Sequence, residues 1–133
     1  MKILGIEHIG IAVTTNNDKF WKIVLGIKHT KKESVKNQGV ITDIYDTKKG
    51  KIELLQSLYP GSVIDKFIKK RGPGIHHICF EVESIRDAVT VLKKEKVKLI
   101  DEIPRMGAEK YKIVFIHPDS TGGVLVELAE KTI

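Results

Sequence analysis

Cysteine is almost absent from this sequence, and its scarcity limits the kinds of protein that the chain can be. Cys79 is the single cysteine in 133 residues, so the chain cannot close an internal disulfide. No apolar run approaches the ~18–20 residues that span a bilayer, and Met1-Lys2 leads directly into a strand pattern with no secretory segment. These absences argue against a disulfide-rich secreted domain and a helical membrane protein, and we expect a cytoplasmic protein with no membrane partner.

Aromatic residues are also scarce, at 6% of the chain, whereas basic residues are plentiful. Lysine and arginine number 23 against 17 aspartates and glutamates, which gives a net charge of +6. The basic residues are spread along the chain and are not interleaved with the aromatic rings that stack on bases, so we do not expect nucleic-acid binding. A small polyanion is a better match for this modest positive charge.

The length suits one domain over residues 1–133, because a chain of this size buries roughly 65–70% of its unfolded surface. Within it, residues 74–82 repeat residues 5–13. Aligned without gaps, the identical pairs are Gly5/Gly74, Ile6/Ile75, His8/His77, Ile9/Ile78 and Val13/Val82. Such self-similarity predicts a duplicated structural unit.

Each half of the chain has the pattern of strand, helix and three strands. The first half predicts strands at 3–13, 27–30, 39–46 and 51–58, and the second predicts strands at 74–82, 97–100, 111–117 and 124–128. We therefore expect an α+β fold of two tandem βαβββ modules, residues 1–60 and 74–133, joined by a linking helix within 61–73.

Three helices are expected from capping residues and apolar spacing. In the first, within 15–26, Phe20, Trp21, Val24 and Leu25 form a stripe that we expect to pack in the core. The second, Ser62–Arg71, should turn Val63, Ile64, Phe67 and Ile68 inward. The third begins after Ser84 and should turn Ile85, Ala88, Val89 and Leu92 inward.

Histidines and glutamates occupy equivalent places in the two halves. Strand alternation puts His8 on one face with Gly10 and Ala12, and the repeat matches His77 to His8, which leaves His76 on the opposite face. Ile52-Glu53-Leu54 closes the first half as Val126-Glu127-Leu128 closes the second. Taken singly, such a histidine is more often a hydrogen-bonded structural residue, and Glu53 could face water.

Taken together, these four residues predict a metal centre. Nitrogen from two imidazoles and oxygen from two carboxylates suit a borderline divalent ion such as Co²⁺, Ni²⁺, Zn²⁺ or Mn²⁺, and the sequence does not choose among them. Such an ion acts as a Lewis acid and stabilises the enolate that forms when a proton leaves the carbon beside a bound carbonyl.

Five segments give the sequence a family resemblance: residues 7–13, 38–40, 52–55, 74–78 and, most specific of all, His117–Leu128. In these segments the chain resembles the vicinal oxygen chelate superfamily, which includes glyoxalases, bleomycin resistance proteins and dioxygenases, and within it the methylmalonyl-CoA epimerase family. The resemblance implies paired βαβββ modules that form curved mixed sheets around a metal site, and a homodimer. It also implies metal ligands at His8, His77 and Glu127, with Glu53 where the family has a glutamate or glutamine.

The reaction implied by the resemblance is epimerisation of methylmalonyl-CoA at C2, which requires one acid/base group on each face of the substrate. Glu127 is the candidate for one group and Glu53 for the other. Some family members are thought to use a glutamate two residues after the valine of Gln38-Gly39-Val40, and Thr42 stands there. Asp43 or a bound water are further alternatives for the second group.

Other functions of the superfamily remain open at this point. A glyoxalase I is the second choice, although small bacterial-type glyoxalases resemble one another in an arginine four residues after the first ligand histidine, where this chain has Ala12. A metal-free resistance-type binding protein is disfavoured by the four retained ligand-type residues. An extradiol dioxygenase is disfavoured because its site uses two histidines and one glutamate around iron, and its chain is usually longer.

Overall fold

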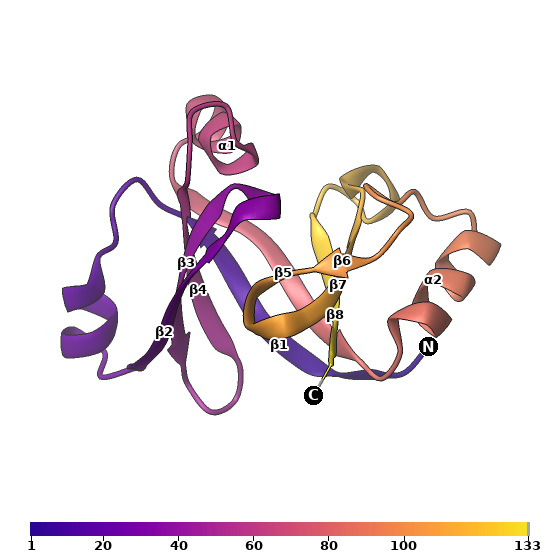
Figure 1. The fold of residues 1–133 in the computed structure, drawn as a ribbon, viewed down its shortest axis with the longest axis horizontal. Helices are drawn as coiled ribbons and strands as arrows, with labels where there is room; N and C mark the ends of the chain where they lie inside the picture. Colours follow the sequence, from indigo (N-terminus) through magenta and orange to yellow (C-terminus); the bar gives the residue numbers. More distant parts are fainter. Residues whose placement is uncertain (133) are drawn as a thin grey trace. The chain divides into compact units, whose positions relative to one another are not determined.

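The computed structural model describes residues 1–132, so only the last residue of the second predicted module lies outside it. The first half contains β1 (Ile3–Ala12), η1 (Lys19–Val24), β2 (Lys28–Val35), η2 (Lys36–Gln38), β3 (Val40–Asp46), β4 (Lys51–Ser57) and α1 (Val63–Arg71) (Figure 1). The second contains β5 (Gly74–Val82), α2 (Ile85–Lys94), β6 (Arg105–Met106), η3 (Ala108–Lys110), β7 (Tyr111–Ile116), η4 (Pro118–Ser120) and β8 (Val126–Lys131).

The strands form one mixed sheet in the order β2-β3-β4-β1-β5-β8-β7-β6. In the first half, β1 pairs with β4 in parallel, and β3 runs antiparallel to both β2 and β4. In the second half, β5 pairs with β8 in parallel, and β7 runs antiparallel to β8 and β6. The two halves thus repeat the same pairing pattern, which confirms the α+β fold predicted from the duplication.

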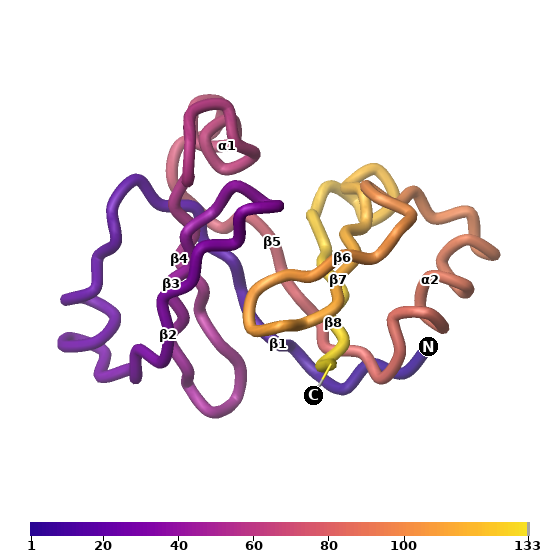
Figure 2. Tube along the Cα trace, in the orientation of Figure 1, coloured from indigo at the N-terminus to yellow at the C-terminus, as the bar shows by residue number. Residues whose placement is uncertain are grey.

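The chain divides into two compact units, residues 8–76 and residues 1–7 with 77–133. In the second of these units, α2 lies along β7 and β8 (Figures 1 and 2). Its core contains Ile85, Ala88 and Leu92 from the helix, packed with Val114 and Leu128 among others. The Oγ of Ser84 accepts a hydrogen bond from the Asp87 N–H, so the helix starts where the capping pattern predicted.

The strand predicted at 97–100 is wrong as a regular strand, because only Leu99 forms an isolated bridge there. This segment meets β7 through a bridge between Leu99 and Ile116 and through the hydrogen bond from Ile100 N–H to Phe115 O. The regular edge strand, β6, lies five residues further along and was not predicted, because its two residues are too few for an alternating pattern.

No helix within residues 1–132 is long and apolar enough to cross a bilayer.

The helix η1 departs from the prediction. Phe20, Val24 and Leu25 are 40%, 64% and 51% exposed, so the expected core stripe is wrong for these three side chains. The cause is the wide π-type turn, in which the Leu25 N–H donates to Phe20 O, five residues back. This winding does not keep the apolar positions of an α-helix on one face, and Trp21 is the residue whose ring packs on Tyr45.

Tyr45 secures the loop before η1 to the sheet. Its side chain is fully buried on β3, and its hydroxyl donates to Asp18 Oδ1 at 2.6 Å, with Asn16 Oδ1 at 3.2 Å. Burial, followed by the hydrogen bond to Asp18, raises the pKa of Tyr45 to about 12. The phenol is therefore a neutral donor throughout the physiological range.

The linking helix α1 is tied to the end of β4. Ser62 caps the helix by accepting from the Asp65 N–H, and its Oγ lies 2.6 Å from Ser57 Oγ. Ile64 is buried as predicted, whereas Val63, the first residue of α1, is 62% exposed, so the prediction that it turns inward is wrong. The α1 helix thus begins against the face of β4 that carries Glu53, since residues 53, 55 and 57 share one face.

Candidate metal centre

The first candidate pair lies on the parallel strands β1 and β4. Gly10 is directly opposite Glu53, and His8 lies two residues before Gly10 on the same face. His8 Nδ1 is 3.0 Å from Glu53 Oε2. Both residues are buried, with 6% and 5% of their surface exposed.

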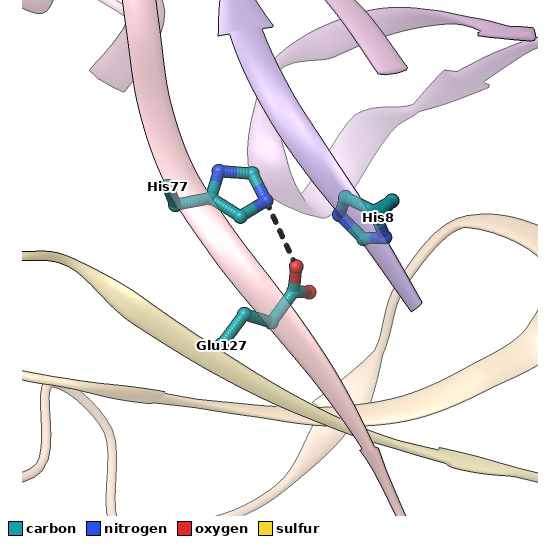
Figure 3. Close-up of side chains that lie close together, drawn as sticks. All are labelled: His8, His77 and Glu127. Atoms are coloured by element: carbon teal, nitrogen blue, oxygen red, sulfur yellow. Dashed lines mark ion pairs between the residues drawn. The ribbon is translucent and has the colours of Figure 1, made fainter. Parts of the chain in front are cut away.

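The second pair lies on the parallel strands β5 and β8. Cys79 is directly opposite Glu127, and His77 lies two residues before Cys79 on the same face. His77 Nε2 is 3.0 Å from Glu127 Oε1 (Figure 3). These two residues are also buried, each with 5% exposed.

The two pairs are equivalent in register. In each pair, the residue opposite the glutamate lies two positions after the histidine on the neighbouring strand. The pairing of the strands therefore reproduces the sequence repeat. The structure therefore brings Glu53 to His8 and Glu127 to His77. One difference is the ring atom that faces the glutamate, Nδ1 in His8 and Nε2 in His77.

Because the two pairs are buried, an ionised glutamate in either of them is costly unless a positive charge or hydrogen-bond donors offset it. An ionised carboxylate that is shielded from water requires a cation or several donors to offset its desolvation. A protonated imidazole beside each glutamate would provide this, as would a bound metal ion. The donor set of imidazole nitrogen and carboxylate oxygen fits a borderline divalent ion.

Thr42 and Asp43 are neighbours on β3 that face opposite sides. Thr42 pairs with Leu55, which shares the face of Glu53, whereas Asp43 pairs with Leu54 on the other face. Asp43 Oδ1 is 2.9 Å from His29 Nε2. The alternative in which Asp43 moves the substrate proton is therefore wrong for this fold, because its carboxylate faces away from Glu53.

Three further residues, His76, Glu7 and Phe115, lie next to the predicted ligands in the sequence or in the structure. His76 faces away from His77, as the repeat predicts, and its ring packs on Phe67 of α1 at 4.9 Å between centroids. Glu7 is buried beside His8 in the chain, at 8% exposed, and the sequence reading did not single it out. Alternation along β1 gave no reason to include it. The aromatic ring of Phe115, 5.5 Å from that of His77, was also missed because β7 carries no recognisable motif.

Comparison with known proteins shows which family the chain belongs to. Residues 7–115 match the family model described as the glyoxalase/bleomycin resistance protein/dioxygenase superfamily. The chain belongs to this superfamily. The match covers most of the chain and includes His8, Glu53 and His77.

Several proteins that are similar to this chain are named methylmalonyl-CoA epimerases. The mitochondrial methylmalonyl-CoA epimerase of Dictyostelium discoideum is 40% identical over 129 residues, which are 95% of this chain and 78% of that protein. The crystal structure of methylmalonyl-CoA epimerase from Mycobacterium tuberculosis superposes with a TM-score of 0.94 at 32% identity, over 98% of this chain and 90% of that one. A structure of methylmalonyl-CoA epimerase in complex with methylmalonyl-CoA and NH₄⁺ superposes at 0.92 with 27% identity, over 98% and 96% of the two chains.

These relatives decide between the enzyme classes left open by the sequence. The relatives named above are methylmalonyl-CoA epimerases, which are isomerases. We therefore assign it to the isomerases.

Proposed function

We propose that this protein epimerises methylmalonyl-CoA at C2, using one divalent cation held by His8, Glu53, His77 and Glu127. The observation that carries the proposal is the pair of equivalent, buried histidine–glutamate contacts, each 3.0 Å long. The epimerases of similar sequence give the substrate, an acyl-CoA.

The repeat supports a single shared cation, because each half contributes one histidine and one glutamate. In each half the imidazole nitrogen and the carboxylate oxygen lie 3.0 Å apart. A metal ion about 2.0–2.2 Å from each nitrogen and oxygen would fit between donors at such separations. The donor types leave the ion open among Co²⁺, Ni²⁺, Zn²⁺ and Mn²⁺.

A bound divalent ion would supply Lewis acidity, which stabilises negative charge on a thioester oxygen. The chain's own residues would move the protons. In the proposed reaction the C2–H bond breaks, its proton passes to a carboxylate oxygen of one glutamate, and a proton from a second group forms a new C2–H bond on the opposite face. Glu127 and Glu53 are the two groups, and their burial keeps bulk water from competing for the proton.

The acid/base roles are tested by following hydrogen exchange separately from inversion. Each pure epimer of methylmalonyl-CoA would be incubated in heavy water with the wild type, Glu127→Gln and Glu53→Gln. We expect inversion to fall by about 10²–10⁴-fold in both variants, the usual contribution of a general acid or base. Each variant should still exchange the α-proton of one epimer, and it should be the opposite epimer in the two cases. Wild-type inversion in Glu127→Gln would mean that Glu127 is not a proton carrier.

The metal role is tested with matched histidine variants. His77→Ala should lose divalent ion and activity while its circular dichroism stays close to wild type. His76→Ala should keep both, because His76 packs on Phe67 and faces away from His77. Full metal occupancy in His77→Ala would refute the ligand assignment. Turnover of a glutathione hemithioacetal in place of the acyl-CoA would instead favour the glyoxalase reaction.

We further propose that the enzyme is a cytoplasmic homodimer. Ile3, Leu4 and Ile6 on β1 are 47%, 51% and 53% exposed, and such a row of apolar side chains on one strand is commonly covered by a partner. Cys79 is the single cysteine of the sequence and its side chain is buried, so the chain has no internal disulfide, as suits a reducing compartment. Light scattering should give about twice the 15.0 kDa mass of the chain. A 15.0 kDa particle at micromolar concentration would contradict the dimer.

A further inference from the structure

Phe115 is next to both members of the His77–Glu127 pair. On β7 it stands directly opposite Glu127 of β8 in the antiparallel register. Its ring centroid lies 5.5 Å from that of the His77 imidazole, with the two planes at 83°. One side chain therefore borders the carboxylate and the imidazole at once.

This edge-on contact constrains the imidazole. T-shaped pairs at 4.5–7 Å are favourable, and a perpendicular neighbour limits rotation of the imidazole about its last side-chain bond. That rotation decides whether His77 presents Nε2 to Glu127, as it does here. Ligand histidines need such control because ring orientation sets which nitrogen reaches the metal.

The Phe115 ring is itself held in place. It packs against a cluster of buried side chains on the same face of the sheet, made of Cys79, Tyr111, Ile113 and Ala129. These four residues are between 0% and 9% exposed, so the surface under the ring is closely packed and apolar. Because the Phe115 ring is packed in this way, it can restrict the movement of the neighbouring His77 ring.

We propose that Phe115 is a positioning residue that fixes the His77 imidazole with Nε2 toward Glu127 and so prepares the site for a divalent cation. The inference rests on the proposed metal function. Outer residues that orient a ligand histidine typically contribute 10–100-fold to metal affinity, usually through a hydrogen bond. Here we assign that contribution to an aromatic contact.

Phe80 provides a matched control. It is also partly buried, but it is on the other face of β5 and packs against the core under α2. Phe80→Leu and Phe115→Leu remove the same atoms from the same residue type. Only the second removes the ring beside His77.

The test is titration of the apo full-length protein with Co²⁺ or Zn²⁺ alone, followed by calorimetry. Phe115→Leu should weaken binding by about tenfold or more. Phe115→Tyr, which keeps the ring, should stay within about twofold of wild type. Phe80→Leu should lower the melting temperature and leave the metal affinity unchanged. Wild-type affinity in Phe115→Leu, or an equal loss in Phe80→Leu, would overturn the inference.

A second readout separates this inference from the proposed function. Nitrogen-15 spectra of the histidine side chains, recorded without metal, report which His77 nitrogen carries the proton. Phe115→Leu should convert one defined His77 tautomer into a mixture, and Phe80→Leu should not. If the wild type bound no metal, the proposed centre would fail, whereas an unchanged His77 spectrum in Phe115→Leu would refute the positioning role itself.

Discussion

The imidazole of His29 pairs with the carboxylate of Asp43 between β2 and β3, with Nε2 2.9 Å from Oδ1. Asp43 is 2% exposed, and its Oδ2 has no hydrogen-bond partner within residues 1–132. The pair lies on the face of β3 opposite to Thr42, so it is separate from the candidate metal centre.

His29→Ala should therefore reduce stability without reducing catalysis. Loss of the imidazole leaves a buried acceptor unsatisfied, which costs about 1–3 kcal/mol. Urea denaturation would measure the loss, and kcat per folded molecule should match wild type. Loss of kcat at full stability would mean that the pair does participate in the reaction.

The raised pKa of Tyr45 predicts that the free energy of unfolding falls at high pH. Its pKa rises from 10.0 to about 12 on folding, so the folded state keeps a proton that the unfolded state has lost. The stabilisation is complete below pH 10, and it disappears as the pH rises from about 10 through about 12. Tyr45→Phe should remove this part of the pH dependence and cost about 1 kcal/mol at pH 7. An unchanged alkaline profile in Tyr45→Phe would contradict the assignment.

The two serine caps should differ in their contribution to stability. Ser84→Ala removes one bond, from the Asp87 N–H, and should cost about 1 kcal/mol. Ser62→Ala removes the bond from the Asp65 N–H and also the contact with Ser57, so it should cost about 0.5–1.5 kcal/mol more. Thermal or urea unfolding of the two variants tests this ranking. Equal losses would show that the Ser57 contact contributes nothing.

Thr42 and Glu53 should be partly exchangeable in function. Thr42 pairs with Leu55, which places it diagonally across from Glu53 on the same face. If a carboxylate on this face serves as the second acid/base, Thr42→Glu in a Glu53→Gln background should raise inversion at least about tenfold over Glu53→Gln alone. Gln56→Glu in the same background is the control, since Gln56 faces the other side. Rescue by the control would show that the gain is only a charge effect.

The sequence predicted the elements that depend on local pattern. The repeat around His8 and His77, the serine caps of α1 and α2, and the alternation along β4 each follow from nearest neighbours in the chain. The repeat also identified His8, Glu53, His77 and Glu127 as equivalent residues of the two halves. The strand register and the 3.0 Å separation within each histidine–glutamate pair came from the structure.

What the sequence could not predict depends on contacts between distant residues. The exposure of Phe20, Val24 and Leu25 follows from a π-type turn that an apolar stripe does not encode. The approach of Phe115 to His77 joins β7 to β5, and no motif marks Phe115 in the sequence. Asp43 was offered as a base because it is next to Thr42, yet neighbouring strand residues face opposite sides.

The two histidine–glutamate pairs use different ring atoms, Nδ1 in His8 and Nε2 in His77. The two halves therefore keep the same pair of residue types but differ in the ring nitrogen that meets the carboxylate. Under the proposed function, Glu53 and Glu127 would serve opposite faces of one carbon atom. This difference means that the two faces of the carbon would not meet identical acid/base groups.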